Sequence, residues 1–125
     1  MTPDLVSTSY SFTSGADVDV YLCHGQTGEW KLVGMSIVSS ATVSGGTNKF
    51  TLAVTETAGG TTVATTLATA STTLTVGVAK QLTMSEAGAA REFGATDSVK
   101  CVYDESGTVS GVNYQIVCQW QKARV

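Results

Sequence analysis

Charged residues are scarce in this chain, and their scarcity excludes one class of partner. Of the 125 residues 14% are charged, and the formal net charge is −3, whereas roughly a quarter of the residues in an average soluble domain are charged. A chain without a basic patch does not neutralise a phosphate backbone, so we expect no nucleic-acid partner. Threonine and serine must then supply the polar surface, which suits a protein that packs against copies of itself or against a large partner.

Cysteine is also scarce. Cys23, Cys101 and Cys118 lie far apart in the sequence, with no Cys-x-x-Cys pair, so neither a zinc site nor a disulfide scaffold is expected. Each lies in an alternating segment, where a thiol packs as a small hydrophobic group. We expect three reduced thiols, with a Cys23–Cys101 or a Cys101–Cys118 bridge as the alternatives. Reduced thiols fit a protein that folds in a cytoplasm.

Long apolar runs are absent from the sequence. No basic segment followed by an apolar core occurs after Met1, so no secretory signal is predicted. No apolar run approaches the roughly 20 residues that a membrane-spanning helix needs. We therefore expect no membrane partner.

The sequence is instead rich in alternation between apolar and small polar side chains. Apolar residues recur at every second position in 50–55, 73–78 and 114–120. Because successive side chains of a strand point to opposite faces, this pattern predicts strands with one buried face and one solvated face. About eight such segments alternate with glycine-containing turns. We predict an all-β fold, a single-domain antiparallel sandwich or barrel that spans residues 1–125.

Individual segments carry more detailed expectations. Residues 1–13 are predicted to form an N-terminal arm or an edge strand. A strand at 17–23 is predicted to turn through a hairpin at 24–29 into a strand at 30–39, whose inward residues are predicted as Lys31, Val33, Met35 and Ile37. A strand is predicted at 49–55 with Phe50, Leu52 and Val54 inward, then a weak strand or an extended loop at 61–69, and a strand or bent pair at 73–83 with a bulge or bend at Gly77. The remaining predictions are a helical turn within 85–93 capped by Ser85, a strand at 98–103, a tight turn at 104–108 and a last strand at 112–121.

No constellation of residues predicts catalysis. His24, the single histidine, is expected at a hairpin tip as a surface residue without a nucleophile beside it. Asp17 and Asp19 face the same side of a strand, but two carboxylates are too few to hold a cation. Nothing fixes the separation that Glu29 and Glu86 would need as a glycosidase pair. We predict no enzyme activity, no cofactor and no metal site.

Aromatic residues leave a second interpretation open. Trp30, Tyr103, Tyr114 and Trp120 have flat faces of the kind that pack on pyranose rings, and aromatic rings also fill sandwich cores. Tyr114 and Trp120 share one face of the last strand, so we expect both in the core. Trp30 and Tyr103 remain candidates for glycan stacking, in which case the chain is a carbohydrate-binding or host-recognition module.

Several segments together resemble a known family. The run 18–22, the glycine-containing loop after it and the run 30–34 are similar to small capsid decoration proteins (cement or head-knob proteins) of tailed bacteriophages, as are the strands at 51–55 and 97–102. The Ala-Ala-Gly-Asp turn typical of that family is replaced here by residues 94–97, Gly-Ala-Thr-Asp.

The resemblance implies a fold, a partner and a location. The expected fold is a jelly-roll β-sandwich, commonly homotrimeric and without catalytic residues. The expected partner is the major capsid protein, bound on the outer surface of a phage head that is assembled in the host bacterial cytoplasm. The segments least explained by sandwich packing are the N-terminal arm and the Ala/Glu-rich stretch after Ser85, so we predict assembly contacts at Tyr10, Phe12, Arg91 and Phe93.

Overall fold

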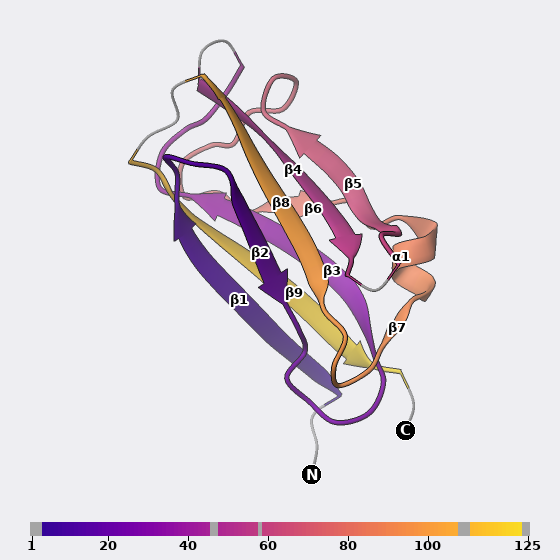
Figure 1. Cartoon of the computed structure of the whole chain (residues 1–125). Helices are drawn as coiled ribbons and strands as arrows, with labels where there is room; N and C mark the ends of the chain where they lie inside the picture. Colours follow the sequence, from indigo (N-terminus) through magenta and orange to yellow (C-terminus); the bar gives the residue numbers. More distant parts are fainter. Residues whose placement is uncertain (1–3, 46–47, 58, 108–110, 124–125) are drawn as a thin grey trace.

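Two antiparallel sheets face each other across a shared hydrophobic core (Figure 1). The computed structural model describes residues 4–45, 48–57, 59–107 and 111–123. Within these residues, sheet A has the strand order β1-β9-β3-β6, with β7 paired to β3, and sheet B has the order β2-β8-β4-β5. The elements are β1 (Leu5–Thr13), β2 (Val18–Leu22), β3 (Trp30–Ser39), β4 (Asn48–Glu56), β5 (Thr62–Ala68), β6 (Lys80–Leu82), α1 (Glu86–Ala90), β7 (Glu92–Phe93), β8 (Val99–Gly107) and β9 (Asn113–Lys122).

The strands pair in a nested order. The first strand pairs with the last, β1 with β9, and inside that pair lie β2 with β8, β3 with β6 and β4 with β5. This wrapping is the strand order of a jelly roll, a double-sheet arrangement built from two Greek keys. The predicted all-β sandwich is therefore confirmed. Of residues 1–13, predicted as an arm or an edge strand, residues 5–13 form the edge strand β1 of sheet A, and residues 1–3 lie outside the described residues.

Aromatic rings fill the space between the sheets. The predicted alternation of β9 buries every second residue, and Phe50, Leu52 and Val54 of β4 point inward as predicted. One end of the core contains Trp30, Phe93 and Trp120, and the other contains Phe12, Phe50, Tyr103 and Tyr114 with ring centroids 4.8–5.3 Å apart. Such tilted and edge-on ring pairs add to the free energy gained from burying apolar area.

The prediction for the inward face of β3 is wrong in its first half. Trp30 and Leu32 are buried, whereas Val33 is 45% exposed. The register with β9 shifts between Leu32 and Gly34. A bulge of this kind adds one residue to one strand and so reverses the side on which the following residues lie. Met35 and Ile37, beyond the bulge, are buried as predicted.

Three predicted connections also differ from the structure. Residues 24–29 do not close a hairpin, because β2 belongs to sheet B and β3 to sheet A. Residues 73–83 form no continuous strand: Leu74 bridges Val43, Gly77 adopts a positive φ, and pairing resumes only at β6. The turn predicted at 104–108 starts too early, since β8 pairs with β4 as far as Gly107; residue 108 lies outside the described residues.

The short helix lies where the sequence predicts a helical turn. The Ser85 hydroxyl accepts a hydrogen bond from the Gly88 amide at 2.9 Å, and its own proton is donated to the Thr62 carbonyl. A cap of this kind satisfies an amide that the first helical turn leaves unpaired. Gly88 permits α1 to lie directly on β5, because a Cβ built at Gly88 would be 2.6 Å from the Val63 Cα.

Replacing Gly88 tests this close approach. We expect Gly88→Ala to lower the free energy of unfolding by about 1–3 kcal/mol, because the added methyl group must displace backbone. Gly34→Ala is the matched control: its Cβ meets the flexible end of Gln119 at 3.0 Å, so a change of about 0.5 kcal/mol or less is expected. Urea unfolding of both variants measures the difference, and equal losses would contradict the close packing of α1 on β5.

Candidate functional site

The structure buries several residues that the sequence marked as candidates for binding. Trp30 and Tyr103 are both fully buried, so neither presents a ring to a sugar, and their assignment to glycan stacking is wrong in this fold. Phe93, predicted as an assembly contact, is also fully buried, between Trp120 and the Arg91 guanidinium. Of the four predicted assembly contacts Tyr10 is the most exposed, at 48%, while Phe12 is half-buried against the core.

His24 occupies a buried position rather than the surface of a hairpin tip. The chain crosses between the sheets here, and the imidazole enters the end of the core, 5.5 Å from the Trp120 ring and 5.9 Å from the Trp30 ring. Nε2 lies 3.0 Å from the Phe93 carbonyl and 2.9 Å from the Gly94 carbonyl, and Nδ1 accepts the Gln26 amide. These partners assign the proton to Nε2 and give His24 a structural role, with no nucleophile among its contacts.

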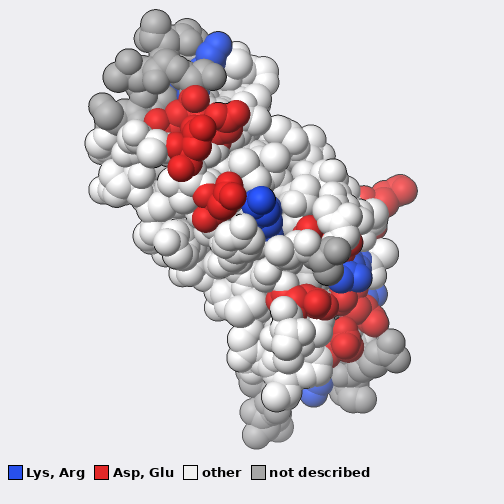
Figure 2. All heavy atoms as spheres, viewed as in Figure 1, with Lys and Arg blue, Asp and Glu red and all other residues white. Residues whose placement is uncertain are grey.

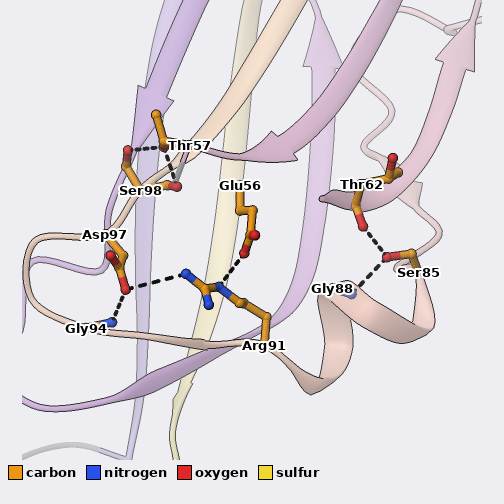
Figure 3. Close-up of polar contacts among 9 residues, drawn as sticks. All are labelled: Glu56, Thr57, Thr62, Ser85, Gly88, Arg91, Gly94, Asp97 and Ser98. Atoms are coloured by element: carbon orange, nitrogen blue, oxygen red, sulfur yellow. Dashed lines mark hydrogen bonds and ion pairs between the residues drawn. The ribbon is translucent and has the colours of Figure 1, made fainter. Parts of the chain in front are cut away.

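Arg91 joins three segments at one end of the sandwich (Figure 3). Its Nε forms an ion pair with the buried carboxylate of Glu56, and Nη2 lies 3.9 Å from Asp97 Oδ2. Asp97 in turn accepts the Gly94 amide at 2.8 Å, and Thr57 bonds the Ser98 carbonyl at 2.6 Å. The predicted assembly contact Arg91 is therefore engaged within its own chain, where it joins the end of β4 to the segment before β8.

Arg91 and Lys100 offer a matched comparison of two ion pairs. Removing Arg91 leaves the Glu56 carboxylate buried without its cation, whereas Lys100 and Asp19 form a pair 3.5 Å apart at the surface. We expect Arg91→Met to cost about 1–3 kcal/mol of unfolding free energy and Lys100→Met less than about 1 kcal/mol. Thermal and urea unfolding check both values. A loss for Lys100→Met as large as that for Arg91→Met would refute the role assigned to Arg91.

The three cysteines are free thiols. Cys23 is exposed, while Cys101 of sheet B and Cys118 of sheet A are buried in the core. Burial raises the pKa of Cys101 from 9.0 to about 12, and burial together with the neighbouring Cys101 raises the pKa of Cys118 as well. Burial likewise raises the pKa of the Tyr103 and Tyr114 hydroxyls. All four groups therefore stay neutral to a higher pH in the folded chain than in the unfolded chain.

These raised pKa values predict instability in alkali. The unfolded thiols ionise from pH 9.0, whereas the folded Cys101 thiol stays protonated up to about pH 12. The contribution of the neutral thiol to the free energy of unfolding is therefore fully present below pH 9.0 and is lost as the pH rises towards 12. The expected slope is about 1.4 kcal/mol per pH unit for each thiol. Urea unfolding across this range should show a shallower decline for the double variant Cys101→Ala, Cys118→Ala than for the unmodified chain. Identical slopes would show that these thiols do not govern the alkaline loss.

The outer face of sheet A is uncharged over most of its area. None of the ten acidic residues of the chain falls in β1, β3, β6 or β9. The cross-strand register brings hydroxyl, carboxamide and small apolar groups together on this side. We call this surface the neutral face; its residues are Ser7, Ser9, Ser11, Val33, Ser36, Val38, Asn113, Gln115, Val117 and Gln119.

Two shallow hollows mark the neutral face. One, of 340 Å³, lies at the end of the face where β3 leaves the sheet, and the other, of 250 Å³, lies near the start of β1. The first is lined by Ser11, Val38, Ser39, Ser40, Asn113, Tyr114 and Gln115, and the second by Leu5, Val6, Ser7, Val33 and Gln119. Both combine exposed apolar carbon with hydroxyl and amide groups that donate and accept hydrogen bonds.

The outer face of sheet B has a different chemistry. Asp19 and Lys100 form their ion pair there, with Asp104 and the half-exposed Tyr21 nearby in the register. Figure 2 is viewed with β2, β8 and β4 in front, as in Figure 1, and shows several separate groups of acidic atoms along the molecule. The two faces of the sandwich thus differ in charge: the neutral face of sheet A contains no charged residue, and the charged residues of that sheet, Lys31, Lys80, Glu92 and Lys122, lie outside it.

Sequence reasoning missed the neutral face although a signal for it exists. The ranges 5–13, 30–39 and 113–122 all lack Asp and Glu. The shared lack of Asp and Glu indicates a common uncharged face only once β9 is known to lie between β1 and β3. The pairing of β1 with β9 joins residues about a hundred positions apart, so the sequence alone does not reveal it.

Comparison with protein-family models, with characterised proteins and with solved structures finds no match to this chain. Among the described residues, no group of three or more His, Cys, Asp and Glu side chains is placed to hold a metal ion. No helix in the same part of the chain has the length and apolar character to span a membrane.

Proposed function

We propose that this chain is a structural protein of a tailed-bacteriophage virion, which decorates the outside of the head by binding the major capsid protein through the neutral face. The observation that carries the proposal is the contrast between the two faces: an acidic chain keeps its carboxylates off β1, β9, β3 and β6, the strands of the neutral face and its edge, and the only carboxylate of sheet A is Glu92 in the two-residue strand β7. The jelly-roll order, which viral capsid domains share, and the resemblance of residues 18–22 and 30–34 to decoration proteins support it by analogy.

An uncharged face suits a protein that binds a shell in many copies. The buried centre of a protein interface is depleted of charged residues, because each buried charge must be stripped of water. Serine hydroxyls and glutamine carboxamides form hydrogen bonds at lower desolvation cost. The acidic residues then remain on the other surfaces of the chain, including sheet B, where they keep the bound protein hydrated.

The carbohydrate-binding alternative depended on two aromatic residues, Trp30 and Tyr103. Both lie in the core. A stacking platform needs an aromatic face open to solvent, so we do not retain this second function.

Charge substitutions on the two faces test the proposed docking surface. The chain is co-expressed with the major capsid protein encoded in the same genome, and the assembled shells are isolated by sedimentation. We expect Gln115→Glu with Gln119→Glu to reduce occupancy of the shells at least about tenfold, because two carboxylates would be desolvated at the interface. Thr55→Glu with Thr65→Glu, which adds the same charge to sheet B, should leave occupancy unchanged.

Two results would contradict the proposal. Failure of the unmodified chain to bind shells would refute the proposed function. Loss of occupancy by the sheet B variant as strong as that of the sheet A variant would refute the neutral face as the docking surface. Circular dichroism of the variants establishes that each is folded before its binding is compared.

A further inference from the structure

The sandwich has four sheet edges, and three of them are obstructed. In sheet A, β6 is only three residues long and begins with Lys80. In sheet B, β2 is five residues long and contains Asp19. The edge of β5 is covered, because Thr65 donates to the Thr83 carbonyl at 2.7 Å and Ser85 donates to the Val63 carbonyl at 2.9 Å. Short strands, charged side chains and covering segments are the devices that keep sheet edges from pairing with other chains.

The fourth edge, β1, has none of these devices. Its nine residues pair with β9 from Leu5 to Thr13 without a register shift, and they include no charged residue and no proline. Among the described strands β1 pairs with β9 alone, and it lies at the left margin of the molecule in Figure 1. Alternate amides and carbonyls of such a strand point away from the sheet and form an open row of donors and acceptors.

We propose that β1 pairs antiparallel with β1 of a second copy of this chain, about a two-fold axis at Ser9. In this register the strand is complementary to itself. On the core side, Val6 of one copy faces Phe12 of the other, and Thr8 faces Tyr10. On the outer side, Ser7 faces Ser11, and Ser9 faces Ser9 of the second copy. Sheet A then continues from one sandwich into the next.

The exposure of Tyr10 supports a second copy of the chain as the partner of β1. Tyr10 is the cross-strand neighbour of Ile116, which is fully buried, yet the tyrosine is 48% exposed. Val6 and Phe12, on the same side of β1, are only partly buried against the core. A second β1 strand would cover all three side chains, because diagonal and directly opposite residues of paired strands are in contact.

The charge distribution supports it as well. Two copies that each carry a net charge of −3 repel one another, but β1 and β9 contain no Asp or Glu. The nearest carboxylate in the sequence, Asp4, lies beyond the end of β1. The copies can therefore meet along an uncharged seam, where like-charge repulsion is weakest.

This pairing fixes the symmetry of the assembly. An isologous contact, in which the same strand contributes from both sides, closes as a dimer and cannot join three copies in a ring. The proposal thus replaces the homotrimer that the family resemblance implies. It does not depend on binding to a shell, and it is tested with the purified chain alone.

Two double variants with substitutions at the same positions provide the test. Ser7→Lys with Ser11→Glu places Lys opposite Glu twice across the seam, so we expect a dimer. Ser7→Lys with Ser11→Lys places Lys opposite Lys twice, so we expect a monomer, although this variant brings the net charge closer to zero and weakens the overall repulsion. Sedimentation equilibrium over a dilution series measures both, with the unmodified chain as a dimer.

Cross-linking checks the register independently. In a Cys23→Ser background, Ser9→Cys should form a disulfide-linked dimer under mild oxidation, because the two thiols meet at the axis. Ser11→Cys should not, because its two copies would lie roughly 14 Å apart along the strands, beyond the reach of a disulfide. A monomeric or trimeric unmodified chain, an equal response of the two lysine-containing variants, or equal cross-linking at positions 9 and 11 would each overturn the proposal.

Discussion

The packing of aromatic rings between the two sheets is the interaction on which the rest of the structure depends. Phe50 and Tyr103 of sheet B meet Phe12 and Tyr114 of sheet A at one end of the core. At the other end, Trp30, Phe93 and Trp120 close around His24. Because these rings come from both sheets and from the crossing loop, they hold the sheets in register and leave only the outer faces and the edges of the sandwich for contacts with other molecules.

Much of the fold could be predicted from the sequence because strand alternation is a local signal. The inward residues of β4 and β9 follow from a period of two. The same rule fails in β3, where one extra residue at Val33 reverses the faces, and no local pattern announces that bulge. It also fails for the loop after β2, since a glycine-containing connection looks the same whether it closes a hairpin or crosses to the other sheet. His24 and Trp30 were misplaced as a consequence.

The candidate site was much less predictable than the fold. A face is defined by strands that lie side by side, and the neutral face combines β1, β9 and β3, which are distant in the sequence. The candidate residues named from the sequence were mostly large and aromatic. Most of them are buried, because aromatic rings gain the most free energy when they are removed from water. The serine and glutamine residues that remain outside are inconspicuous one by one, and only their arrangement on one sheet distinguishes them.

The nested pairing also governs the order in which the chain can fold during synthesis. The last strand, β9, lies between β1 and β3 and is the main partner of both. Sheet A therefore cannot assemble until β9 has left the ribosome, although β1 emerges before every other strand of the sandwich. Contacts between residues so distant in the sequence form slowly. Until β9 is made, β1 lacks its partner, and its open edge can pair with other chains. β1 is therefore the strand of sheet A that stays unpaired longest during synthesis, when exposed strand edges are prone to aggregation.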